Sequence, residues 1–168
     1  YWPFSEDIND RGLSRKHLME SVERSLKRIG TEYLDIYFCH RFDEDTPIEE
    51  TARAMDDLIH QGKILYWGTS EWTGEQLEDA LQICEKRNLY RPQVEQPMYN
   101  LLERRKVEKD VRVVLQKHGL GLVTYSPLAS GFLTGKYDDG IPDGAESVGP
   151  YGGPVIPVSC NSQVFEGA

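Results

Sequence analysis

The sequence contains little cysteine and no long apolar run. Only three cysteines, Cys39, Cys84 and Cys160, occur in 168 residues, and an odd number of widely spaced thiols favours free cysteines in a reducing compartment over a disulfide framework. No apolar stretch approaches the ~20 residues that a bilayer-spanning helix needs, and the N-terminus lacks the pattern of a signal peptide. We therefore expect a cytoplasmic protein without membrane insertion.

Basic residues are also in deficit. The chain has 28 acidic and 19 basic residues, which gives a formal net charge of −9. Such a chain has no positive field to attract phosphate backbones, so nucleic acid is not an expected partner. A hydrophobic content of 39% with 10% aromatics is typical of a globular domain with a real core.

Several common site motifs are absent. The pair Gly119 and Gly121 lacks the third glycine of the dinucleotide fingerprint, because Thr124 occupies its place. The stretch 131–136 resembles a phosphate-binding loop but has one residue too few between its glycines. No His or Cys pair has zinc spacing, and His17, His60 and His118, on or beside helices, are expected to face solvent or to cap. The acidic run 43–45 is expected to be a solvated loop or to match the charge of a helix N-terminus. We predict no metal site.

Alternating strand and helix patterns fill most of the chain. Strands are expected over 33–39, 64–68, 94–97 and 119–125, and helices over 14–29, 47–61, from Thr73 onwards, and over 103–118. Ser14 and Thr46 are expected to cap the first two helices, Gly30 to end the first, and Thr73 with Gln76 to form a capping box. This alternation predicts an α/β fold with a parallel sheet. Glycine and proline recur after Tyr137, so we expect one domain over 1–142 and an irregular or disordered tail over 143–168.

Polar side chains stand where each expected strand ends. Because parallel strands of a barrel end on the same rim, these residues should converge although they lie roughly 25–30 positions apart along the chain. The alternative is that the ends of the strands are simply hydrated. The residues concerned are His40, Arg41, Ser70, Glu71, Gln96, Tyr125 and Ser126.

Five segments, 12–17, 31–41, 46–50, 66–70 and 125–131, together resemble the aldo-keto reductase superfamily. Within it, the chain is most similar to the branch that contains the β-subunits of voltage-gated potassium channels and their bacterial relatives. The resemblance covers roughly residues 1–142. It implies a partial (β/α)8 TIM barrel, from about the fourth strand to the seventh with their helices, in a family that reduces carbonyls with NADP(H) by means of an Asp, Tyr, Lys and His tetrad.

The resemblance also implies roles for individual residues. His40 matches the tetrad histidine, which polarises the carbonyl; in channel β-subunits this position resembles an asparagine, so histidine favours the enzymatic relatives. Ser70 and Gln96 match the residues that hold the nicotinamide carboxamide, and Tyr125 matches the aromatic that stacks on the ring. The expected pyrophosphate loop contains Ser126, Leu128, Ser130, Gly131 and Lys136, while Arg41 and Trp72 are expected to contact the substrate.

The tetrad Asp, Tyr and Lys have no match in this sequence, and neither does the segment that grips the adenosine 2′-phosphate. We therefore expect an NADP-dependent oxidoreductase acting on a small carbonyl substrate, of which this chain is an incomplete and inactive piece. One alternative is a non-catalytic, cofactor-sensing regulatory module like the channel β-subunits. Another is an inactive fragment whose exposed sheet edges drive self-association into a homo-oligomer.

Overall fold

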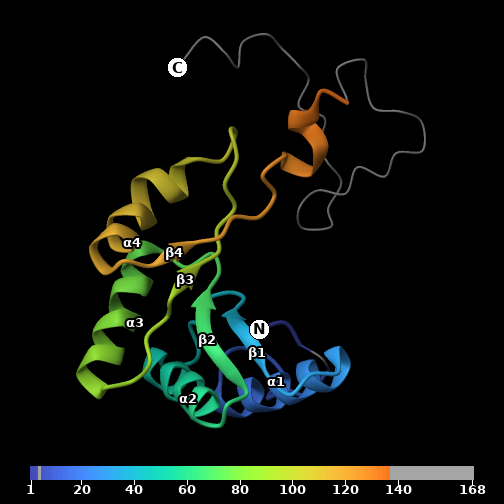
Figure 1. The fold of residues 1–168 in the computed structure, drawn as a ribbon, viewed down its shortest axis with the longest axis vertical. Helices are drawn as coiled ribbons and strands as arrows, with labels where there is room; N and C mark the ends of the chain where they lie inside the picture. Colours follow the sequence, from blue (N-terminus) through green and yellow to red (C-terminus); the bar gives the residue numbers. More distant parts are fainter. Residues whose placement is uncertain (4, 137–168) are drawn as a thin grey trace.

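Four parallel strands form the centre of the fold in this computed structural model, which describes residues 1–3 and 5–136. Their order in the sheet follows the chain, β1-β2-β3-β4 (Figure 1). The strands are β1 (Leu34–Cys39), β2 (Ile64–Thr69), β3 (Val94–Glu95) and β4 (Gly121–Leu122). The predicted parallel α/β architecture is confirmed and is consistent with part of a barrel, while the assignment to strands four to seven stays a prediction.

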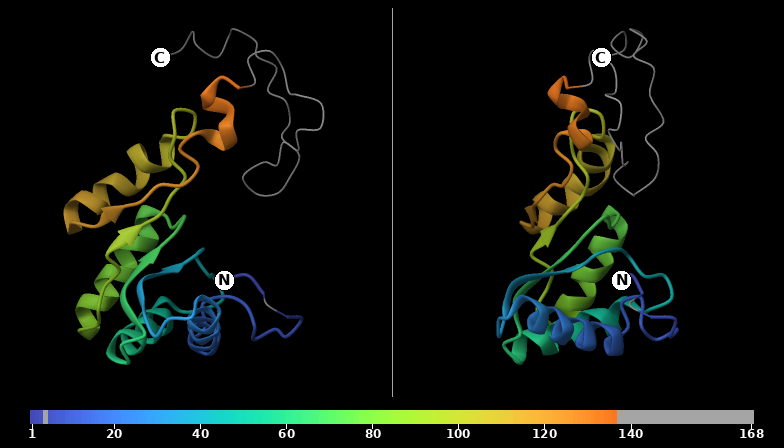
Figure 2. Two further views of the ribbon diagram at one scale, coloured as in Figure 1. Left: turned by 45° about the vertical axis from the view of Figure 1, so that its right-hand side comes forward. Right: turned by 90° about the vertical axis from the view of Figure 1, so that its right-hand side faces the viewer.

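Helices connect the strands and follow one another along one side of the sheet (Figures 1 and 2). They are α1 (Arg15–Ile29), α2 (Ile48–His60), α3 (Gly74–Arg87) and α4 (Arg112–His118), which continues a π-helical turn, η1 (Lys106–Val111). A 3-10 helix, η2 (Ala129–Thr134), follows β4. The predicted boundary at 142 and the predicted tail 143–168 lie outside the described residues.

The ends of two helices follow the sequence signals closely. The Ser14 hydroxyl accepts a hydrogen bond from the backbone N–H of His17 and caps α1, and Gly30 ends that helix in the left-handed conformation. Thr73 and Gln76 form the predicted capping box of α3. The expected cap by Thr46 at α2 is wrong, because Thr46 donates its hydroxyl to Asp43 instead.

The two later strands are shorter than predicted. The expected strand 119–125 is reduced to two paired residues plus an isolated bridge between Met98 and Tyr125. The expected strand 94–97 keeps only Val94 and Glu95, and Pro97 has no N–H with which to extend the ladder. The chain after each short strand leaves regular structure early, at the edge of the sheet where the polar residues lie.

The core lies between the helices and the sheet. Trp67, Met55, Leu58 and Leu77 are fully buried there. On the strands, however, Ile36 of β1 is 42% exposed, and its partner in the ladder, Tyr66 of β2, is 55% exposed. Large exposed side chains paired across two neighbouring strands are consistent with a barrel wall whose interior layer is incomplete in this chain.

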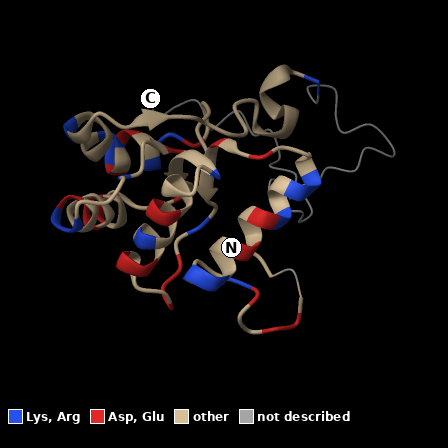
Figure 3. Cartoon of the chain, turned by 60° about the horizontal axis from the view of Figure 1, so that its bottom comes forward, with Lys and Arg blue, Asp and Glu red and all other residues tan. Residues whose placement is uncertain are grey.

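Basic and acidic side chains are interspersed along the helices (Figure 3). An example is Glu49 of α2, which binds both Arg53 of the same helix and Arg87 of α3. Within the described residues, no helix combines the length and apolarity needed to cross a bilayer.

Candidate functional site

Three polar residues meet at the edge of the sheet formed by the C-terminal ends of its first three strands. The Ser70 hydroxyl, directly after β2, donates a hydrogen bond of 2.8 Å to the backbone carbonyl oxygen of Gln96. Arg41, shortly after β1, donates from Nη1 to the same hydroxyl at 3.4 Å. Backbone hydrogen bonds between strands hold Ser70 and Gln96 in place. The Ser70 N–H donates to Cys39 O at 3.0 Å, and the Gln96 N–H donates to Thr69 O at 2.8 Å. The structure therefore brings Arg41, Ser70 and Gln96 together.

His40 stands beside this group at the end of β1. Its ring is exposed and meets the ring of Trp2 edge-on, with centroids 6.0 Å apart. Arg41 donates a hydrogen bond to the carbonyl oxygen of His40. Partial desolvation, followed by the charge of Arg41, lowers the pKa of His40. The imidazole is therefore predominantly neutral at pH 7 and keeps one N–H donor.

Tyr125 is tied to the same edge through Glu71. Glu71 accepts from the backbone N–H of Met98 at 2.6 Å, from Lys106 Nζ at 2.7 Å and from the Tyr125 hydroxyl. It adopts a left-handed conformation, with φ of 62°, which is unusual for a residue other than glycine. The sequence predicts Glu71 at the end of a strand but does not predict that it holds Tyr125.

The residues predicted for a pyrophosphate loop follow Tyr125. Ser126, Ala129, Ser130 and Gly131 all have positive φ values, between 48° and 91°, and such turns can orient backbone N–H groups toward an anion. A Cβ added to Gly131 would lie 2.5 Å from Cε of Lys136, so the lysine side chain lies directly over this glycine. Leu128, also predicted for this loop, is largely exposed. Backbone donors and one ammonium group are a donor set that suits a phosphate.

Glu95, the last residue of β3, was not among the predicted site residues. The residue is 0% exposed and accepts hydrogen bonds from the Thr69 hydroxyl and from the backbone N–H of Trp72, the latter at 3.1 Å. Burial raises the pKa of its carboxyl group to about 7. The signal available in the sequence was a carboxyl group inside a segment expected to be a strand, next to Gln96.

Trp72 does not join the group at the edge. It is 1% exposed and packs edge-on against Phe42, with ring centroids 5.0 Å apart. The structure therefore gives no support to the predicted substrate contact, because a core indole offers no surface to a ligand.

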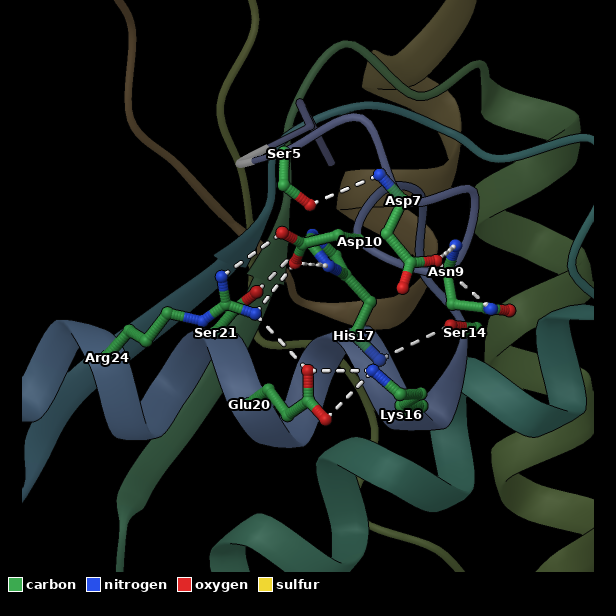
Figure 4. Close-up of polar contacts among 10 residues, drawn as sticks. All are labelled: Ser5, Asp7, Asn9, Asp10, Ser14, Lys16, His17, Glu20, Ser21 and Arg24. Carbon is green, nitrogen blue, oxygen red and sulfur yellow. Dashed lines mark hydrogen bonds and ion pairs between the residues drawn. The ribbon is translucent and has the colours of Figure 1, made fainter.

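The prediction that His17 is solvent-facing or capping is wrong. His17 is 0% exposed; its Nδ1 lies 3.3 Å from Asp10 and its Nε2 lies 3.3 Å from the Ser21 hydroxyl (Figure 4). Arg24 binds Asp10 at 2.7 Å and holds the pKa of that carboxyl at about 2. The order Asp, His, Ser is that of a hydrolytic triad, but burial of the histidine and serine leaves no room for a substrate. The network instead fastens the segment before α1 to that helix.

The acidic run 43–45 is only partly the solvated loop that was expected. Asp43 is buried and accepts from the Leu13 N–H and the Thr46 hydroxyl, both at 2.7 Å, and from the Asp45 N–H at 3.1 Å. Glu44 and Asp45 are exposed. Over residues 1–3 and 5–136, no three His, Cys, Asp or Glu side chains gather as a metal site would require.

Comparison with known proteins gives one consistent result. A sequence model of the aldo/keto reductase family matches residues 5–151. The chain is 52% identical over 132 residues to proteins from Arabidopsis thaliana and Oryza sativa subsp. japonica, each named "Probable voltage-gated potassium channel subunit beta". It is 50% identical over 137 residues to a "Putative voltage-gated potassium channel subunit beta" from Schizosaccharomyces pombe. These alignments cover 79%, 79% and 82% of this chain but 40% of each relative, so the chain spans about 40% of their length.

Proposed function

Because the chain belongs to the aldo/keto reductase family, we propose that it forms the nicotinamide-binding part of an NADP(H)-dependent oxidoreductase that reduces aldehydes or ketones to alcohols. The observation that carries the proposal is the contact of Arg41, Ser70 and Gln96 at one edge of the sheet, with His40 beside them. A cytoplasmic location and a small carbonyl substrate belong to the same proposal.

In this function, some of these residues would orient the nicotinamide and His40 would polarise the substrate carbonyl. Bound NADPH would supply the hydride. Ser70 and Gln96 would hold the carboxamide, and Arg41 fixes the Ser70 hydroxyl from the other side. The neutral imidazole of His40 would donate its N–H to the substrate carbonyl oxygen, where negative charge develops. A lowered pKa suits this role because the ring then carries no charge of its own into the site.

Tyr125 and the loop after it would hold the rest of the cofactor. Glu71 restrains the Tyr125 hydroxyl and thereby limits rotation of the ring that would stack on nicotinamide. Beyond Tyr125, the left-handed turns and Lys136 would meet the pyrophosphate. Gly131 fits this arrangement because any side chain there would displace the lysine.

We further propose that the 168-residue chain alone does not turn over. The tetrad Asp, Tyr and Lys have no counterparts among its residues, and His40 by itself supplies no aligned proton donor of the tyrosine type. Incubation with NADPH and a panel of aldehydes should leave the absorbance of NADPH unchanged. Turnover at the rate of a full-length relative would overturn this part of the proposal.

The names of the relatives favour a second function. They are described as potassium channel β subunits, so a longer protein containing this chain could sense the cofactor and regulate a membrane partner without catalysis. His40→Asn in that longer protein separates the two functions. For an enzyme, kcat should fall by about 10²- to 10³-fold with nearly unchanged NADPH affinity; for a regulator, no turnover exists to lose.

Cofactor binding by the chain itself can be tested by fluorescence titration with NADPH. Tyr125→Ala should weaken binding by about fivefold, from the loss of about 1 kcal/mol of stacking. Tyr90→Ala is the matched control, since Tyr90 is an exposed tyrosine before β3, at the opposite end of that strand from the site. Equal dissociation constants for the two variants would refute the assignment of Tyr125.

A further inference from the structure

The carboxyl group of Glu95 binds residues on both sides of Ser70 in the sequence. It accepts from the hydroxyl of Thr69, the residue before Ser70, and from the N–H of Trp72, two residues after it. Glu95 also immediately precedes Gln96, whose backbone carbonyl oxygen accepts a hydrogen bond from the Ser70 hydroxyl. One buried carboxyl group thus joins the two segments that carry the expected carboxamide ligands.

Few charges can offset an ionised carboxylate at this position. Lys106 of η1 favours the charged form, whereas Glu71, in the loop after β2, opposes it. From β1 the buried thiol of Cys39 faces the same region, and burial raises its pKa. Desolvation is the dominant influence on Glu95 and raises its pKa to about 7.

Thermodynamic linkage then gives the direction of the effect. A raised pKa means that the closed, buried arrangement binds the proton more tightly than any open arrangement in which water reaches the carboxyl group. Loss of the proton therefore favours opening of the segments that Glu95 joins. In the protonated form, the carboxyl group and the Thr69 hydroxyl can share one hydrogen bond, with the Trp72 N–H satisfied by the other oxygen.

We propose that Glu95 is a positioning residue which, in its protonated form, holds the Ser70–Gln96 pair closed for the nicotinamide, and which releases that pair when it ionises. The link to nicotinamide rests on the proposed function, whereas the link between Glu95 and the pair does not. Cofactor binding should accordingly weaken as the pH rises through neutrality and should be accompanied by proton uptake at alkaline pH.

Amide hydrogen exchange of the chain without cofactor is the first test. The Ser70 and Gln96 N–H groups are both bonded across strands, and their protection factors divide out the intrinsic effect of pH on exchange. We expect protection in the wild type to fall as the pH rises from 6 through about 7 and to level off by pH 8.5. It should stay constant in Glu95→Gln, which is neutral throughout. The same pH dependence in both proteins would overturn the inference. If Glu95→Gln did not fold, the carboxyl ¹³C signal of wild-type Glu95 would decide, and a group that fails to titrate between pH 6 and 8.5 would overturn it.

NADPH titration over the same pH range is the second test. A pKa of about 7 in the closed arrangement, against an ordinary value of 4.5 in a hydrated one, makes opening about tenfold more favourable at pH 8.5 than at pH 6. The dissociation constant should therefore rise by up to about tenfold over this range. Glu95→Gln should bind alike at both pH values, and Glu95→Ala should bind weakly at both. Glu78→Gln is the control, since Glu78 also joins two segments, through Lys117 and His118, but its pKa is about 2. It should retain the pH dependence of the wild type.

The two tests separate the two hypotheses. Absence of NADPH binding at either pH would count against the proposed function, while the exchange measurement would still decide the role of Glu95. Binding that is strong and independent of pH in the wild type would leave the proposed function standing and overturn the positioning role.

Discussion

Gly68 is the position where one added methyl group should damage the sheet most. It lies in β2 between Phe38 of β1 and Val94 of β3. A Cβ at this position would lie 2.6 Å from both Cγ1 and the carbonyl oxygen of Val94, and 2.9 Å from Cε1 of Phe38. The side-chain atoms can rotate away, but the carbonyl oxygen belongs to the backbone of the neighbouring strand. Gly68→Ala must therefore push β3 away from β2.

The expected loss of unfolding free energy comes from overpacking and from weakened hydrogen bonds between β2 and β3. Two backbone bonds join the strands around this point, from the Gln93 N–H to Trp67 O at 2.9 Å and from the Gln96 N–H to Thr69 O at 2.8 Å. Overpacking of a core by a methyl group costs about 1–3 kcal/mol, and each weakened hydrogen bond adds about 1 kcal/mol. We expect the free energy of unfolding to fall by about 3 kcal/mol or more.

Gly121→Ala in β4 is the matched control on the other side of β3. Its Cβ would lie 3.5–3.8 Å from atoms of Gln93 and Val94, which is ordinary contact. Both substitutions stabilise the fold similarly by restricting the unfolded chain. The difference between their free energies of unfolding therefore reports the clash at Gly68. Urea denaturation followed by circular dichroism measures both free energies. A difference below about 1 kcal/mol would show that β3 yields easily and would refute the reasoning.

Much of the fold could be predicted because its signals are local. The capping box of Thr73 and Gln76 and the left-handed Gly30 are each set by residues a few positions apart. The convergence of Arg41, Ser70 and Gln96 was also predictable, since parallel strands that alternate with helices must end on one edge. Their cofactor roles stay predictions, because proximity to one another does not identify a ligand.

The errors concern polar residues whose partners are distant in the sequence. Asp43 binds Leu13, 30 positions away, and Glu95 binds Trp72, 23 positions away. A carboxylate in an acidic run looks solvated when only its neighbours are considered. His17 lies close in the sequence to its contacts Asp10 and Ser21, but its complete burial was likewise not visible from its neighbours along the chain. Such partners become visible only when tertiary packing is known.

Two remaining predictions test these buried polar groups. Asp43→Ala should lower the free energy of unfolding by about 3 kcal/mol, because it leaves buried donors unpaired. Glu44→Ala, in the same acidic run, should change that free energy by less than about 0.5 kcal/mol. Equal losses for the two variants in urea denaturation would contradict this distinction. The second concerns His17, whose pKa is lowered chiefly by burial. A depressed histidine pKa means that the unfolded chain binds the proton more readily than the folded chain. Its stabilising effect is therefore fully present above the ordinary pKa of about 6.5 and is lost as the pH falls below that value. Unfolding free energies measured between pH 7.5 and pH 5 should decline in the wild type, and His17→Gln, which cannot be protonated, should decline less steeply. Parallel curves for the two proteins would mean that the buried imidazole does not control this loss, and that the acid sensitivity of the fold has another origin.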